Sequence, residues 1–122
     1  MIRIFLMYDD QQFCDDLRDY LHLQGDFAIC GASPNAMESV KLMPDLVILE
    51  RSRECDFTVV ENLRQAMPGL PLFLVADEVN PDMEKAALSH GVEAVFCKED
   101  DPAALASNAR AIYHLVARPQ IQ

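Results

Sequence analysis

A set of acidic residues and one lysine stand where their side chains could hold a cation or a phosphoryl group. Asp9, Asp10, Glu50, Asp77 and Lys98 each lie directly at the end of an apolar run. Carboxylate oxygens are the ligands that Mg²⁺ prefers, and a lysine beside them can neutralise excess charge or bind a phosphoryl oxygen. Taken singly, such residues are equally well explained as helix caps or solvated strand-end charges. Together, at the ends of several strands, they predict a polar site.

The apolar runs are predicted to form a parallel β-sheet. They are short and continuous, and the stretches between them have the 3.6-residue periodicity of amphipathic helices. Strands joined by helices require right-handed crossovers and a sheet covered by helices on both faces. Ligands of such sheets bind beyond the carboxyl ends of the strands, which is where the polar residues stand. The predicted strands are 2–7, 27–30, 46–49, 72–75 and 94–97.

Turn residues delimit the predicted helices. Gly25 closes the first helix and Gly91 the fourth, while Asp101 and Pro102 open the last. The charged segment 50–57 is predicted to be a loop. These elements give a five-stranded, doubly wound α/β domain over residues 1–118, followed by a loose tail at 119–122. Prolines at positions 34 and 44 delimit the predicted second helix. One face of this helix is expected to carry Ala36, Met37, Val40 and Met43.

Composition narrows the function classes. The 122 residues are 51% hydrophobic, which is typical of a packed globular domain. A formal net charge of -10 repels phosphate backbones, so we expect no direct nucleic-acid binding. The apolar stretch 4–7 runs straight into acids and is neither a signal peptide nor a membrane helix. The four cysteines form no CxxC pair. Cys30 and Cys97, in predicted strands, are expected to be reduced core residues of a cytoplasmic protein.

The order of these features resembles the bacterial response-regulator receiver family. The resemblance covers residues 2 to about 116, and it is most specific at Asp9-Asp10, at 44–50, and at 90–98 followed by Asp101-Pro102. It is strongest toward receivers that are joined to DNA-binding output domains. It implies the strand order 2-1-3-4-5. It also implies Mg²⁺ held by the acid pair and the acceptor aspartate, which takes a phosphoryl group from a histidine kinase.

By this resemblance, Asp9 and Asp10 match the acid pair, and Lys98 matches the lysine that contacts the phosphoryl oxygens. Other positions depart from the family. Glu50 replaces the acceptor aspartate. The family's Met-Pro-Gly loop after the acceptor is replaced by residues 52–55. Two positions linked to switching are also substituted: Ala76 where the family has Ser or Thr, and Val95 where many members have an aromatic residue.

These departures weaken the expected phosphorylation chemistry. Glu50 is one methylene longer than aspartate, and positioning-based chemistry is sensitive to displacements of about 1 Å. Ala76 cannot donate the hydrogen bond that would couple phosphorylation to loop movement. Two interpretations of the pocket stay open. Glu50 and Lys98 form a buried pair that holds one conformation, or Asp9 and Asp10 still bind Mg²⁺ weakly. We favour the first, because a nearby ammonium offsets the need for a cation.

The leading hypothesis is a non-enzymatic signalling module that works through a protein partner or output domain, without phosphorylation and without a required cofactor. The alternative is a receiver that accepts a phosphoryl group weakly, with Mg²⁺. A flavodoxin-like cofactor binder is disfavoured, because the loop 8–12 has no glycine and two negative charges. A homodimer through the fourth helix, fifth strand and fifth helix is also expected. That face is predicted to offer Ala87, His90, Ala111, Tyr113 and Leu115.

Overall fold

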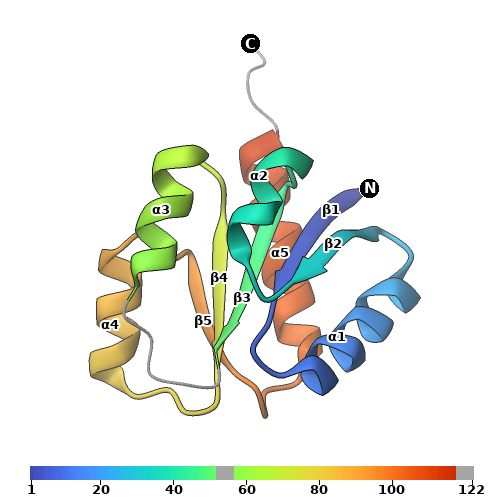
Figure 1. Ribbon diagram of the computed structural model, residues 1–122. Coiled ribbons are helices and arrows are strands. Elements are labelled where there is room, and N and C mark those ends of the chain that lie inside the picture. Colours follow the sequence, from blue (N-terminus) through green and yellow to red (C-terminus); the bar gives the residue numbers. More distant parts are fainter. Residues whose placement is uncertain (52–56, 118–122) are drawn as a thin grey trace.

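The computed structural model describes residues 1–51 and 57–117, with side chains up to residue 115. These residues form a five-stranded sheet in the order β2-β1-β3-β4-β5, and every pair of neighbouring strands is parallel. Figure 1 shows the helices on both sides of this sheet. The predicted fold class and strand order are confirmed. The elements are β1 (Ile2–Met7), α1 (Gln11–Gln24), β2 (Phe27–Ser33), η1 (Ala36–Glu38), α2 (Ser39–Leu42), β3 (Leu46–Arg51), α3 (Thr58–Ala66), β4 (Leu72–Ala76), α4 (Pro81–Ser89), β5 (Ala94–Cys97) and α5 (Pro102–Ala117).

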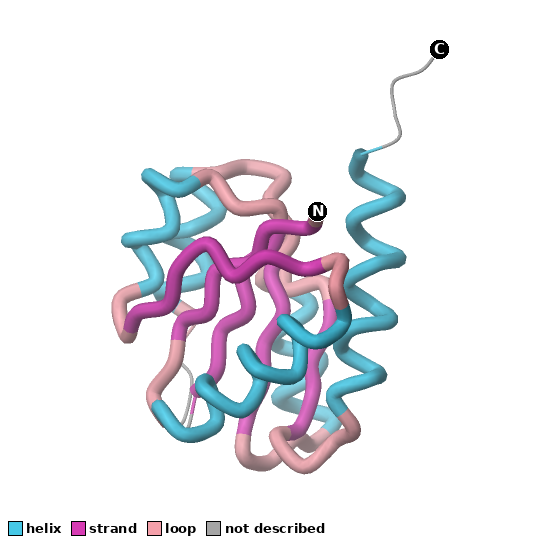
Figure 2. Tube along the Cα trace, turned by 90° about the vertical axis from the view of Figure 1, so that its right-hand side faces the viewer, coloured by secondary structure: helices cyan, strands magenta, loops and turns pink. Residues whose placement is uncertain are grey.

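Two hydrophobic cores lie on the two faces of the sheet. Alternate residues of β1 point to opposite sides, so that Ile4 packs with α1 and α5 while Phe5 packs with α3 and α4. Figure 2 shows α1 and α5 on the side of the sheet that faces the viewer. Because both faces are covered, β3 and β4 are buried almost throughout, as their continuous apolar sequences predict.

Capping residues are found at three helix ends, and two of them, Gly25 and Asp101, are predicted from the sequence. Gly25 ends α1 with a φ of 87°, a left-handed conformation that glycine adopts without steric cost. Asn80 begins α4, since its side chain accepts a hydrogen bond from the amide of Met83. Asp101 precedes α5 and accepts from the amide of Ala103. The loops that precede α4 and α5 are therefore anchored where these two helices start.

Strand β2 is longer than predicted. The sequence prediction ends it at Cys30, but pairing with β1 continues through Gly31 to Ser33. The register shifts between Ile4 and Phe5, which leaves Cys30 as the extra residue of a bulge. Gly31 thus serves close packing rather than chain reversal. A Cβ placed there would lie 2.7 Å from Leu42 Cδ1.

The predicted second helix is wrong in form. A 3₁₀ turn precedes a four-residue α-helix, so the 3.6-residue period that the prediction assumes does not hold. Ala36 and Ser39 are the buried residues, and the Ser39 hydroxyl donates to the Ala36 carbonyl. Met37 is exposed, and Met43 is 73% exposed with a left-handed backbone, so neither lies on the expected face.

The predicted loop at 50–57 is also wrong at its start. Glu50 and Arg51 continue β3, where they pair with Val75 and Ala76 of β4. Residues 52–56 and the tail at 119–122 lie outside the described residues. Charge density is a poor guide here, because a charged side chain remains in a strand when it finds partners there. No helix in the described part of the chain is long and apolar enough to span a membrane.

The tight packing at Gly31 predicts the effect of a single added methyl group. We expect Gly31→Ala to lower the free energy of unfolding by about 1–2 kcal/mol, because the new Cβ collides with Leu42 and the Phe5 ring. In a Leu42→Ala background the same change should cost less, since the nearest atom is gone. Urea unfolding of the four proteins measures the difference. Equal costs in both backgrounds would contradict this explanation.

Candidate functional site

The carboxyl ends of the strands bring one lysine and several carboxylates together. The Lys98 ammonium, at the end of β5, lies 3.0 Å from Asp10 Oδ2, 3.1 Å from Glu50 Oε2 and 3.0 Å from Asp77 Oδ1. These acids come from the loop after β1, from β3 and from the residue after β4. One cation therefore joins three different segments at this edge of the sheet.

Glu50 is the most buried charged side chain of the site, at 2% exposure. Its Oε1 accepts hydrogen bonds from the backbone amides of Asp9, at 2.7 Å, and Asp10, at 2.8 Å. Its Oε2 faces the Lys98 ammonium. A buried carboxylate is tolerated only when its oxygens are satisfied in this way. Aspartate would be shorter by one carbon–carbon bond, about 1.5 Å, and would not span the same partners in this backbone.

Asp10 has two roles at once. Its Oδ2 is bonded to Lys98, and its Oδ1 accepts from the amide of Phe13, which caps the N-terminus of α1. The hydrogen bond from Lys98, and secondly that from the Phe13 amide, hold the pKa of Asp10 below its ordinary value. The helix-cap and the polar-site interpretations are therefore both correct for this residue.

Lys98 is largely enclosed, with 15% of its side chain exposed. Burial disfavours the ammonium, but hydrogen bonds to Asp10, Asp77 and Glu50 outweigh it and raise the pKa of Lys98 well above its ordinary value. The ammonium also lies 5.4 Å from the centre of the Phe13 ring, which adds a cation–π contact. Lys98 is thus a firmly charged group at neutral pH.

Arg51 supplies a second cation that the sequence analysis missed. Its Nε lies 3.3 Å from Asp9 Oδ2. The sequence predicts a loop at this arginine because charged residues follow it. Its position directly after Glu50, at the end of an apolar run, is the signal that would have found it. The carboxylates of Asp10 and Glu50 thus already have a cationic partner in Lys98.

The two positions that the resemblance links to switching, Ala76 and Val95, both have apolar side chains here. Ala76 is buried at the end of β4, and its carbonyl accepts the Lys98 backbone amide at 2.9 Å. Its methyl group offers no hydroxyl to the polar site. Val95 lies half-buried in β5 and packs against the core on the α3 and α4 side. Neither residue provides a polar group that could respond to a change of charge at Glu50.

No protein-family model matches the chain. Solved structures, in contrast, match it over most of its length. A DNA-binding response regulator of the LuxR family from Staphylococcus aureus has 19% identity and a TM-score of 0.78, over 93% of this chain and 99% of that one. A putative pilus assembly-related protein from Burkholderia pseudomallei has 17% identity and a TM-score of 0.80, over 98% and 95%. A CheY-like receiver domain protein from Methanospirillum hungatei has 16% identity and a TM-score of 0.78, over 95% and 96%. The chain has the receiver fold.

In this receiver fold, the expected face of α4, β5 and α5 needs correction. Ala87 is fully buried in the core and cannot offer surface to a partner. His90 stacks on Phe57, with ring centres 4.7 Å apart, and its Nε2 lies 3.5 Å from Glu61 of α3. It therefore faces α3 rather than α5. Tyr113 packs partly against the α1 and α5 core, whereas Ala111 is exposed and Leu115 is 71% exposed.

The contacts of Glu50 and Lys98 predict strong energetic coupling between them. Lys98→Met leaves a buried carboxylate facing a methyl group, and we expect it to cost about 2–4 kcal/mol of stability. Glu50→Gln keeps an acceptor for the Asp9 and Asp10 amides and should cost about 1–2 kcal/mol. The double variant should cost at least about 1 kcal/mol less than the sum in urea unfolding. Lys85→Met, at an exposed lysine of α4, is the control, and additive costs would contradict the coupling.

The lowered pKa of Asp10 predicts a dependence of stability on pH. Because that pKa lies below its unfolded value, the ionised carboxylate stabilises the fold at neutral pH. This contribution is lost as pH falls from about 4 through the folded pKa. The contribution of Lys98, whose pKa is raised, is lost only in strong alkali. In Lys98→Met, the decrease in unfolding free energy between about pH 5 and pH 2 should be smaller, while Lys85→Met should match the parent. An unchanged slope in Lys98→Met would show that this ion pair does not set the dependence.

Proposed function

We propose that this chain is a receiver-fold signalling module that acts through contacts with a protein partner or an output domain, without aspartyl phosphorylation. One observation carries the proposal. The carboxylate at the acceptor position belongs to Glu50, and its contacts are with two backbone amides and the Lys98 ammonium. The pocket is held together by groups of the chain itself, where a receiver's chemistry would need an acceptor open to a phosphodonor.

The geometry that phosphoryl transfer requires supports the absence of phosphorylation in this proposal. The attacking and leaving oxygens must lie roughly in line with the phosphorus, so catalysis depends on positioning. Attack by Glu50 Oε2 would weaken its contact with Lys98, and attack by Oε1 would weaken the hydrogen bonds from Asp9 and Asp10, because an esterified oxygen is a poorer acceptor. Either route weakens the contacts of Glu50, whose side chain is buried, and such a loss is costly.

The switch positions support the same proposal. A ligand or modification shifts a conformational equilibrium only through contacts that differ between the two states. Ala76 has no hydroxyl to donate to a phosphoryl group, and Val95 has no ring to move between a buried and an exposed position. The module therefore presents the same surface at all times, and signalling depends on which partner protein is present to bind it.

The charges of the pocket make Mg²⁺ unnecessary in this proposal. Lys98 and Arg51 already face the carboxylates of Asp9, Asp10 and Glu50. A divalent ion would have to displace one of these cations and would gain few free oxygen ligands. Asp9 and Asp10 then act through their contacts with the chain rather than as metal ligands.

Protein partners fit the charge and the exposed surface. A formal net charge of -10 opposes contact with nucleic acid phosphates, so the partner is a protein. Leu88 on α4 and Leu115 on α5 are large apolar side chains left exposed on the helices that flank β5. We include a homodimer through this face in the proposal. Sedimentation at high concentration tests it, and a monomer for both the parent and Leu115→Asp would exclude it.

The central test is incubation with a small phosphodonor and Mg²⁺, followed by intact mass measurement. We expect no gain of a phosphoryl group in the parent chain. A gain of one phosphoryl mass, lost in Glu50→Gln, would overturn the proposal. The matched variant is Glu50→Asp combined with Ala76→Thr, which restores a short acceptor and a hydroxyl. Phosphorylation of that variant alone would assign the lost chemistry to these two positions. If this variant also stays unmodified, further substituted positions contribute to the loss, and the absence of phosphorylation in the parent still supports the proposal.

Calorimetric titration with Mg²⁺ is a second test of the same proposal. The parent should bind more weakly than about 1 mM, because Lys98 and Arg51 occupy the positions beside the carboxylates. Lys98→Met should bind Mg²⁺ more tightly than the parent, since it uncovers oxygens of Asp10 and Glu50. Binding by the parent tighter than millimolar would contradict the internal neutralisation of the site.

A further inference from the structure

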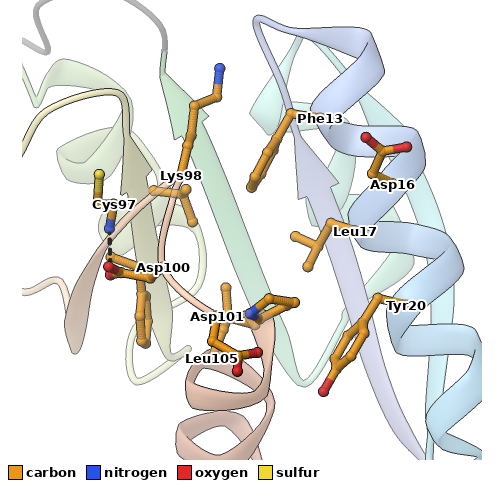
Figure 3. A pocket seen from close by; sticks show the side chains of 12 residues that line it. Phe13, Asp16, Leu17, Tyr20, Cys97, Lys98, Asp100, Asp101 and Leu105 are labelled. Atoms are coloured by element: carbon orange, nitrogen blue, oxygen red, sulfur yellow. Dashed lines mark hydrogen bonds between the residues drawn. The ribbon is translucent and has the colours of Figure 1, made fainter.

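A pocket lies between α1 and the start of α5, next to Lys98 but outside the contacts described above. Its volume is about 230 Å³. Figure 3 shows an open centre, with Phe13, Leu17 and Tyr20 of α1 on one side and Leu105 of α5 on the other. The proposed function assigns no role to this pocket.

The inner wall of the pocket is apolar. Leu17 of α1, Val75 and Phe96 of the sheet, and Leu105 of α5 are buried core residues that line it. For comparison, an apolar cavity of about 150 Å³ in another protein binds benzene. A pocket of 230 Å³ therefore has room for an aromatic ring with a short chain attached. Opening toward solvent gives such a ligand a route in.

The rim of the pocket is negative. Asp16, Asp100 and Asp101 line it and are exposed. Asp100 accepts a hydrogen bond from the Cys97 amide, and Asp101 one from the Ala103 amide, so both carboxylates are held in place. Lys98, the cation among the lining residues, is bound to three carboxylates, and in Figure 3 its ammonium points away from the centre of the pocket. The opening therefore attracts positive charge.

We propose that this pocket binds a small cationic amphiphile, a primary amine carried on an aromatic body. The ring would pack against Leu17, Phe96 and Leu105, and the ammonium would lie at the rim among the three carboxylates. The aromatic side chains of Phe13 and Tyr20 add favourable faces for a cation. This ligand class combines the two properties of the pocket, an apolar interior and a negative mouth.

The test is titration of 2-phenylethylamine into the ¹⁵N-labelled chain, followed by amide chemical shifts. We expect saturable shifts confined to α1 and to the turn between β5 and α5, with a Kd on the order of 1 mM for so small a ligand. 3-Phenylpropionate has the same ring and two-carbon linker but ends in a carboxylate, and it should bind at least about ten-fold more weakly because its charge has the opposite sign. Equal binding of the two, or shifts scattered over the surface, would overturn the proposal.

Variants separate the charge of the rim from the total charge of the chain. Asp16→Asn, Asp100→Asn and Asp101→Asn together keep the hydrogen-bond acceptors and should weaken amine binding about ten-fold. The control removes as much charge elsewhere, through Asp19→Asn, Asp82→Asn and Glu84→Gln, and should bind like the parent. Asp16→Asn alone, at an exposed site, should weaken binding about two-fold and serves if the triple variant does not fold.

A second titration, with a peptide, distinguishes a free amine from a lysine side chain as the ligand. The probe is the blocked tripeptide Lys-Phe-Lys, which offers the same ring and ammonium chemistry on a backbone. Binding of the tripeptide without binding of free 2-phenylethylamine would reject a small-molecule site. Weakening of 2-phenylethylamine binding by the control variant as much as by the rim variant would reject the carboxylates as the recognition element.

Discussion

The carboxylate of Glu50 is the group on which the carboxyl edge of the sheet depends. One oxygen holds the backbone of the loop after β1, and the other faces the ammonium at the end of β5. Strands β1, β3 and β5 are not all neighbours in the sheet, so this single side chain joins segments that backbone pairing alone leaves apart. Such a buried charge is costly to desolvate, and its partners must all be in place for the fold to gain from it.

This arrangement extends beyond Glu50 through Lys98 and Asp10. Lys98 bonds Asp10, which caps α1, and its ammonium lies near the ring of Phe13 in the first turn of that helix. The start of α1 is therefore oriented by the same charges that fill the polar site. Phe13 also lines the pocket between α1 and α5. The shape of that pocket is linked to the ion-pair network, although the pocket's own recognition groups are separate from it.

The sequence predicts the fold well and its irregular parts poorly. Alternating apolar runs and amphipathic helices are enough for a doubly wound parallel sheet, because few arrangements bury both faces of such strands. The errors lie at β2, α2 and the end of β3. The predicted strand ends just before Gly31, but this glycine continues β2 and lies in close approach to Leu42. Arg51 has the signature of a loop but remains in β3 beside Asp9. In each case a contact from a distant segment decided the outcome, and no local pattern records such contacts.

For the candidate site, the residue types and their strand-end positions were determined by the sequence alone. The parallel sheet requires the ends of β1, β3, β4 and β5 to meet at one edge, so the meeting of Asp10, Glu50, Asp77 and Lys98 follows from topology. Only the tertiary structure decided how the charges are shared. The division of the Glu50 oxygens and the second cation at Arg51 depend on distances of about 3 Å between side chains. Those distances are set by side-chain length and backbone register in three dimensions, which sequence spacing does not specify.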